Sequence, residues 1–266
     1  VDIKSGKRAE LFVADNPLQD YAMPTITLGT LKAADGNTDL CYRLITPPNM
    51  KPGEKYPTLV YVYGGPHSQL VTDSWLGGAN LYFTFLAQQG YVVFTLDNRG
   101  TDNRGFEFES CTHRQLGTIE MADQMEGVKY LQSLPYVDTS RMGVEGWSFG
   151  GFMTISLKLA HPEVFKVACA GGPVIDWRWY EVMYGERYMD MPQENPDGYA
   201  NNCLISKAKD LEGRLLVIHG AEDNTVVWQH SIEFIEACIN AGRQVDYFFY
   251  PHHEHNVLGP ERVHLF

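Results

Sequence analysis

From residue 25 to its end, the chain alternates short apolar runs with longer stretches of helical character. Continuous apolar runs bounded by Pro or Gly, such as TLVYVYGG at 58–65 and GRLLVIHG at 213–220, predict strands buried on both faces. Between such runs lie stretches that end at Gly or before Pro, for example NLYFTFLAQQG at 80–90 and GFMTISLKLAHP at 151–162. Strands that alternate with helices predict an α/β domain, with a mostly parallel central sheet and helices on both faces.

The first fifty residues follow a different pattern. Residues 1–24 are mixed, with helical character near KRAELFVADNPL, and we expect a connector there. A strand pair is predicted at 25–36 and 38–48, on either side of a turn. The chain therefore divides into a connector with leading strands at 1–50 and a single α/β domain at 51–266.

The two ends of the chain suggest a piece of a longer protein. The first residue, Val1, is not methionine, and the closing GPERVHLF reads as the first turn of a helix. We expect a chain cut at a domain boundary, with its C-terminal helix truncated.

Composition and charge narrow the function classes. With 44% hydrophobic and 20% charged residues, the composition is that of a soluble globular protein. No apolar run reaches the roughly 18 residues of a membrane span, and the opening VDIKSGKRAE lacks the apolar core of a signal peptide. A net charge of −12 argues against nucleic acid or an anionic membrane as a partner. The five scattered cysteines contain no C-x-x-C pair, which argues against a disulfide framework and a zinc knuckle.

Three chemically matched residues each follow a different predicted strand. Ser148 lies in the G-x-S-x-G sequence GWSFG, Asp223 in HGAEDNTV, and His255 in YPHHEHNV. Because functional groups of open α/β sheets gather at the carboxyl ends of the strands, we expect the three side chains to meet there. The chain order Ser, Asp, His is the order that α/β-hydrolases use. The G-x-S-x-G spacing alone also fits an ordinary glycine turn, so the prediction depends on all three residues together.

These residue types suit nucleophilic catalysis. A serine hydroxyl is a weak nucleophile unless an imidazole accepts its proton, and the imidazole needs a carboxylate to fix its tautomer. The backbone N–H of Phe149, at the start of the helix, would face the developing oxyanion. Tyr63, in VYGGPHS, is the candidate for a second oxyanion donor, with an ordinary place in the core as the alternative.

Several motifs together carry a resemblance to a known family. They are GWSFGG, DNRGTDNRG, YGGPHSQ, GERYM, and HG-x-x-D followed by YP-x-x-x-H. With them the chain resembles the prolyl oligopeptidase family of serine peptidases, in particular its dipeptidyl peptidase IV branch and the bacterial prolyl tripeptidyl aminopeptidases. The resemblance implies an α/β-hydrolase fold, a Ser148–His255–Asp223 triad with Tyr63 and Phe149 as oxyanion hole, and no cofactor or metal. It also implies a β-propeller over the active site, which these residues do not contain.

The resemblance further implies how a substrate binds. A hydrophobic slot for a proline side chain would be formed by Val174, Trp177, Tyr180, Tyr184 and Val226, with the Phe149 ring as one wall. Aromatic faces hold a flat pyrrolidine ring well, although the same aromatics also fit an ordinary core. Glu181 is a candidate to pair with a substrate α-ammonium, or else a solvated helix-surface residue. Thr225 stands where the branch has an asparagine that helps to hold a substrate carbonyl, so that contact is not carried over.

The implied activity is that of a serine exopeptidase that releases two or three residues after proline. The implied partners are peptides with proline at the cleavage site, a possible second copy of the chain, and no nucleic acid. Family habit implies a periplasmic or otherwise exported enzyme. A carboxylic-ester hydrolase on the same fold, a binding module without activity, and a chain inactive without its propeller are the alternatives.

Three other features are assigned no chemistry. The HHEH sequence at 252–255 has no partner cluster for a zinc site, and a triad role already accounts for His255. His219 is interpreted as a strand-end residue satisfied by hydrogen bonds. Asp97 and Arg99 are predicted to form a structural ion pair near the site.

Overall fold

The computed structural model describes all 266 residues and contains one eight-stranded sheet, in the order β1-β2-β4-β3-β5-β6-β7-β8. The two leading strands and the β2–β4 pair are antiparallel, and every other neighbouring pair is parallel. The strands are β1 (Thr25–Lys32), β2 (Asp39–Thr46), β3 (Tyr56–Tyr61), β4 (Val92–Asp97), β5 (Val137–Trp147), β6 (Phe165–Gly171), β7 (Arg214–Gly220) and β8 (Asp246–Tyr250). The predicted mostly parallel sheet is confirmed.

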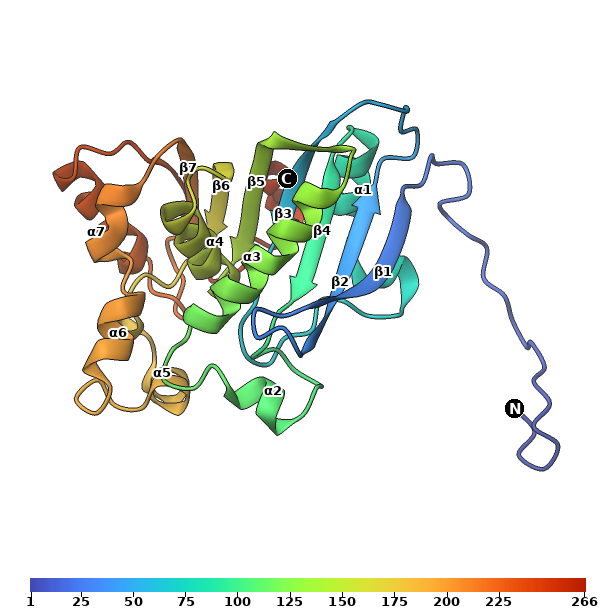
Figure 1. Ribbon diagram of the computed structural model, residues 1–266, viewed down its shortest axis with the longest axis horizontal. Helices are drawn as coiled ribbons and strands as arrows, with labels where there is room; N and C mark the ends of the chain where they lie inside the picture. The colour runs from blue at the N-terminus through green and yellow to red at the C-terminus, as the bar shows by residue number, and fades with distance from the viewer.

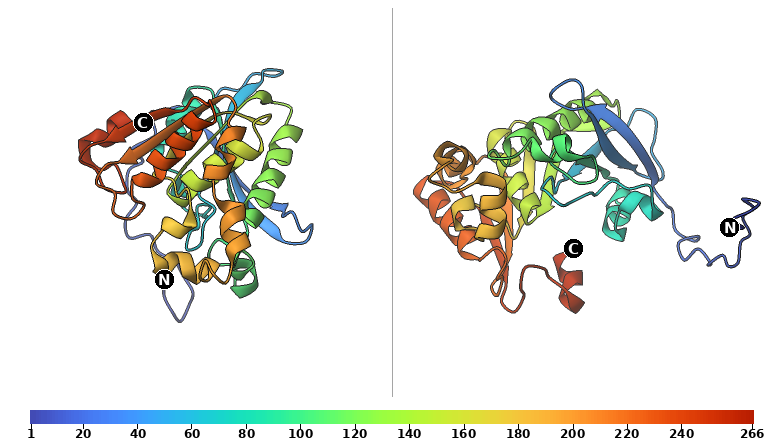
Figure 2. Two further views of the ribbon diagram at one scale, coloured as in Figure 1. Left: turned by 90° about the vertical axis from the view of Figure 1, so that its left-hand side faces the viewer. Right: turned by 90° about the horizontal axis from the view of Figure 1, so that it is seen from below.

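Helices cover both faces of this sheet, as predicted. The α-helices are α1 (Leu81–Gln88), α2 (Phe106–Ser110), α3 (Thr118–Ser133), α4 (Phe149–Ala160), α5 (Val182–Met189), α6 (Pro196–Asn202), α7 (Gln229–Asn240) and α8 (Arg262–Leu265). Figure 1 shows α3, α4 and α7 in front of the sheet, and Figure 2 shows α8 on the opposite side. The longest helix, α3, has 16 residues, and no helix combines the length and apolar character that crossing a bilayer requires.

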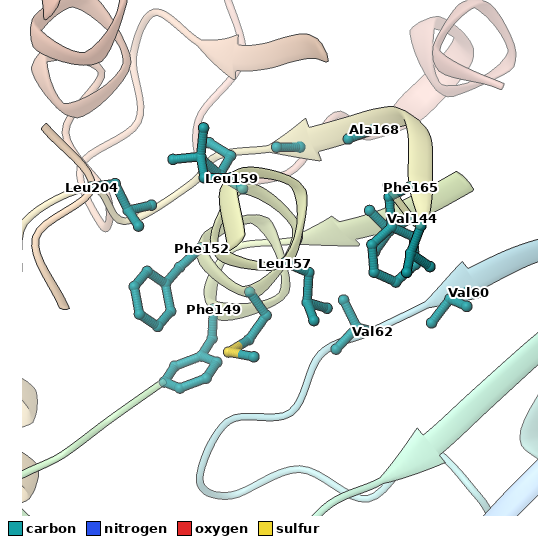
Figure 3. Close-up of a cluster of buried hydrophobic side chains, with 14 of the residues drawn as sticks. Val60, Val62, Val144, Phe149, Phe152, Leu157, Leu159, Phe165, Ala168 and Leu204 are labelled. Carbon is teal, nitrogen blue, oxygen red and sulfur yellow. The ribbon is translucent and has the colours of Figure 1, made fainter. Parts of the chain in front are cut away.

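The core lies around α4, between the sheet and the front helices. Every residue of α4 from Phe149 to Leu159 is buried, as expected of a helix that is apolar on nearly all sides. Figure 3 shows α4 end-on, with Phe149 and Phe152 on one side of it, and with Val144 of β5 and Val62, just beyond β3, nearby. The helix that follows Ser148 is therefore fixed by burial along its whole length.

The N-terminal segment differs from the prediction. Residues 1–24 form no helix or strand and run away from the body of the molecule (Figure 1), so the helical character expected at 7–18 is wrong. Leu11, Phe12 and Val13 are 96%, 84% and 70% exposed. An isolated helix of this length is marginal in water, and here no partner buries its apolar side.

The predicted pairing of Asp97 with Arg99 is also wrong. The Asp97 carboxylate accepts hydrogen bonds from the backbone N–H groups of Leu70 and Val71. Arg99 pairs instead with the fully buried Asp123 of α3, at 2.8 Å, and with Asp35, at 3.0 Å. Asp97 and Arg99 are only two residues apart at the end of β4, but their side chains contact different parts of the fold.

Candidate active site

Ser148 stands on a strained turn between β5 and α4. Its backbone, at φ 62° and ψ −118°, lies in a region that side chains rarely occupy, and its N–H donates to Gly171 O at 2.7 Å. A Cβ on either flanking glycine, Gly146 or Gly150, would lie 2.3 Å from Val62 O, so the turn requires both glycines. The Ser148 side chain makes no capping hydrogen bond to α4, so its hydroxyl is not used up at the helix N-terminus.

Asp223 and His255 form a hydrogen-bonded pair across the loops that follow β7 and β8. His255 Nδ1 lies 2.7 Å from Asp223 Oδ2, while Asp223 Oδ1 accepts the N–H groups of Thr225 and Val226 at 2.9 Å each. Burial opposes ionisation of this carboxyl, but hydrogen bonds from His219 and His255 outweigh it and hold the pKa of Asp223 well below its ordinary value. A charged carboxylate therefore orients the His255 ring.

His219 is a second imidazole on the same carboxylate. Its Nε2 lies 2.7 Å from Val226 O and 3.2 Å from Asp223 Oδ2, and its Nδ1 lies 2.7 Å from Ser231 Oγ. Two acceptors around Nε2 require the proton there, so Nδ1 accepts from the serine hydroxyl. The interpretation of His219 as a hydrogen-bonded strand-end residue is confirmed, but the sequence did not reveal its contact with Asp223. The four-residue spacing in HGAED is the signal for it.

Ser148 and His255 line one cavity, although no hydrogen bond joins them. Catalytic hydrogen bonds in unliganded enzymes are often long and tighten when substrate binds. A further contact, missed from the sequence, connects the two halves of the site: Trp147 Nε1 donates to His255 O at 2.8 Å. The residue next to the serine thus holds the histidine loop.

Tyr63 and Phe149 lie beside Ser148. Burial raises the pKa of the Tyr63 phenol, while a contact with Ser148 opposes the rise, so the phenol is a proton donor at neutral pH. The Phe149 N–H opens α4, where the first backbone donors of a helix lack internal partners. Both predicted oxyanion donors therefore flank the serine.

An aromatic slot of about 20 Å³ opens at Ser148. It is lined by Tyr63, Ser148, Phe149, Val174, Trp177, Tyr180 and Tyr184. The Trp177 and Tyr184 rings stack at 5.9 Å, and Tyr180 meets both edge-on at 5.6 and 5.3 Å. These rings form a flat space for a small apolar group.

Val226, predicted for the slot, and Glu181, predicted to pair with a substrate α-ammonium or to be a solvated surface residue, both lie outside the slot lining. Val226 is fully buried, and its backbone holds Asp223 and His219. Glu181 caps α5, where its carboxylate accepts the Met183 N–H at 3.0 Å. Apart from Ser148 and Val174, the lining of the slot is therefore aromatic.

A larger cavity of about 480 Å³ also reaches Ser148 and was not predicted. Besides Ser148, Tyr63 and His255, its lining includes Tyr61, Tyr82, Glu145, Trp147, Cys169 and Arg262. The signal for it in the sequence is Glu145, a carboxylate inside the otherwise apolar RMGVEGW run.

Known proteins similar to this chain are dipeptidyl peptidases. The chain is 36% identical to dipeptidyl peptidase 8 of Mus musculus over 257 residues, which are 95% of this chain and 28% of that protein. Among solved structures, a Bacteroides ovatus protein assigned as a dipeptidyl aminopeptidase IV is 56% identical with a TM-score of 0.95, covering 96% of this chain and 36% of that one. Porphyromonas gingivalis dipeptidyl peptidase 4 is 35% identical with a TM-score of 0.86, covering 91% of this chain and 34% of that one.

This chain thus spans about a third of the length of the relatives it matches. The likeness of its fold to these two solved structures confirms the predicted α/β-hydrolase architecture. The sequence profile of the prolyl oligopeptidase family matches residues 79–264, which include Ser148, Asp223 and His255. The chain belongs to the prolyl oligopeptidase family.

Proposed function

We propose that this chain carries the catalytic centre of a serine exopeptidase that cleaves peptides after a proline near their free amino terminus. The observation that carries the proposal is the aromatic slot that opens at Ser148, on the same residue as a cavity lined by His255. The Ser148 hydroxyl, with His255 beside it, can therefore attack the carbonyl of a residue whose side chain lies in the slot.

The chemistry proceeds through an acyl-enzyme. His255 takes the Ser148 hydroxyl proton as Oγ bonds to the scissile carbonyl carbon, and the Asp223 carboxylate stabilises the imidazolium. The Tyr63 phenol and the Phe149 N–H donate to the oxyanion. His255 then gives the proton to the leaving nitrogen as the C–N bond breaks. Water attacks the ester in the same way, which releases the acyl peptide and restores Ser148.

The slot supports proline as the residue at the cleaved bond. Its walls are aromatic, and ring faces are the kind of surface on which a flat pyrrolidine ring packs well. An ester hydrolase on this fold would not need such a slot. The named relatives are dipeptidyl peptidases, which favours release of two residues over three.

The proposal extends to the setting of the site. Since the relatives are about three times as long, we propose that the longer protein carries a β-propeller over this site, as the family resemblance implies. From the resemblance alone we also propose that the enzyme works after export. Homodimer formation belongs to the same proposal. Cell fractionation that found the protein only in the cytoplasm would contradict export. Light scattering that found only monomer would contradict the homodimer.

Covalent labelling tests the central claim. A prolyl phosphonate diester and its leucyl counterpart are incubated with the chain, and the adduct is read by intact mass. We expect one adduct on Ser148, formed faster by the prolyl probe, and none in Ser148→Ala at an unchanged melting temperature. Equal labelling rates for the two probes would contradict the proposal that the slot selects proline. An adduct on the Ser148→Ala variant would contradict the assignment of Ser148 as the nucleophile.

A further inference from the structure

The two pockets that meet at Ser148 take opposite sides of the scissile bond. Both are lined by Ser148 and Tyr63, and they share no other residue. The aromatic slot, by the function proposed above, takes the side chain of the residue that becomes acylated. His255 lines only the larger cavity. Because this histidine must protonate the leaving nitrogen, the larger cavity lies on the side of the leaving peptide.

Glu145 gives that cavity its chemical character. It lies three residues before Ser148 on β5, and the one hydrogen-bond partner of its carboxylate is the Tyr82 hydroxyl, at 3.4 Å from Oε2. It forms no ion pair. Burial raises the pKa of Glu145 to about 7, and the Tyr82 hydrogen bond only partly opposes the rise. A weakly partnered, largely buried carboxylate is a strong acceptor for a cation that reaches it.

The other walls suit the stem of a long basic side chain. Trp147 and Tyr61 contribute aromatic faces, and methylene groups pack well on such surfaces while a charged end reaches further. Arg262, the lining residue with a fixed positive charge, is exposed, with its guanidinium 5.5 Å from the Phe266 ring. Solvent therefore screens Arg262 more than it screens Glu145.

We propose that the larger cavity binds the leaving part of the substrate and that Glu145 selects a leaving peptide with a lysine or arginine side chain. This proposal rests on the proposed function, and it names a substrate class for the same site.

The test measures discrimination between leaving groups. Peptides share one acyl part, Gly-Pro, and carry lysine or glutamine at the first or the second leaving position. We expect kcat/KM to favour lysine by about tenfold at one of these positions, the size of one charge-assisted hydrogen bond. In Glu145→Gln the ratio falls to about one. Glu233→Gln removes the same charge from an exposed site on α7 and keeps the wild-type ratio.

The unmodified chain supplies a second measurement. The lysine preference is expected to fall as pH drops from 8 to 6, because Glu145 gains its proton there. The groups that face it are Tyr61, Tyr82, Cys169 and Arg262. Burial raises the pKa values of Tyr61 and Cys169 to about 12 and that of Tyr82 still further, so none of the three titrates in this range. His255 acts alike on both substrates and cancels in the ratio.

The outcomes separate the two proposals. Lysine and glutamine peptides cleaved at equal rates, or a lysine preference that survives in Glu145→Gln, would overturn the role of Glu145 and leave the peptidase intact. Failure to cleave any of these proline peptides would count against the proposed function, and the proposed subsite would fall with it.

Discussion

The two spaces that meet at Ser148 differ in almost every physical respect. The slot measures about 20 Å³ and is walled by rings, whereas the cavity measures about 480 Å³ and contains a carboxylate. The slot lining contains no charged side chain, and Trp177 Nε1 and Tyr184 Oη beside it are buried without hydrogen-bond partners. In the cavity, Glu145 makes the fit depend on charge and pH. By the two proposals above, one side of the bond is selected by sterics and the other by electrostatics.

The largest expected effect removes the chemistry that the two sides share. Asp223→Asn keeps the shape of the carboxylate but favours the wrong His255 tautomer, and we expect the labelling rate to fall about 10⁴-fold. Because neither pocket changes, the prolyl-to-leucyl ratio of the remaining labelling stays as in wild type. Intact mass against time gives both numbers. A loss below tenfold would mean that His255 does not depend on Asp223.

The next effect concerns stability and belongs to the cavity alone. Glu145 has its folded pKa raised to about 7 from 4.5, so its contribution to stability is present below pH 4.5 and is lost as pH rises through 7. Glu145→Gln avoids that loss. We expect the variant to match wild type at pH 4 and to exceed it at pH 8 by about 3 kcal/mol, at about 1.4 kcal/mol per pKa unit.

Thermal unfolding at the two pH values measures this difference. For a chain of this size it corresponds to a rise in Tm of roughly 6 to 12 °C at pH 8. The exposed Glu233→Gln variant controls for net charge, because it removes the same charge outside any cavity. The same Tm difference at pH 4 and pH 8 would show that Glu145 is not the titrating group.

A smaller effect is expected from opening the slot. Tyr180 is half-buried and meets the Trp177 and Tyr184 rings edge-on. Tyr180→Ala removes one wall, and we expect the prolyl-to-leucyl labelling ratio to fall about fivefold, since an aromatic contact contributes about 1 kcal/mol beyond the area it buries. Tyr136→Ala, at a half-buried tyrosine directly before β5, leaves the ratio unchanged. An unchanged prolyl-to-leucyl labelling ratio in Tyr180→Ala would show that other residues recognise proline.

The aromatic slot was predicted from the sequence, whereas the larger cavity was not. The sheet, the helices and the three loops with Ser148, Asp223 and His255 follow from apolar runs and turn residues, which are local signals. The slot aromatics were named through a family resemblance. The larger cavity combines residues from β3, β5, β6, α1 and α8, and no short stretch of sequence reports how their side chains converge.

The errors have the same origin. Arg99 looks local to Asp97 in the sequence, but its partner, Asp123, is 24 residues away on α3. The helical character at residues 7–18 is a local preference that no tertiary contact supports. His219 was recognised as satisfied, yet its contact with Asp223 depends on how the loop after β7 closes.

The smallest expected effect tests whether the slot is as apolar as its lining suggests. Tyr184→Phe removes a buried hydroxyl that has no partner, and we expect the free energy of unfolding to stay the same or rise by up to about 1 kcal/mol. Tyr42→Phe is the matched control, because the Tyr42 hydroxyl lies 2.9 Å from that of Tyr130 and its loss is expected to cost about 1 kcal/mol. Urea unfolding with a constant m-value measures both variants. Equal destabilisation would mean that the Tyr184 hydroxyl has a partner in solution, such as an ordered water, and that the slot can offer a substrate a polar contact as well as a shape.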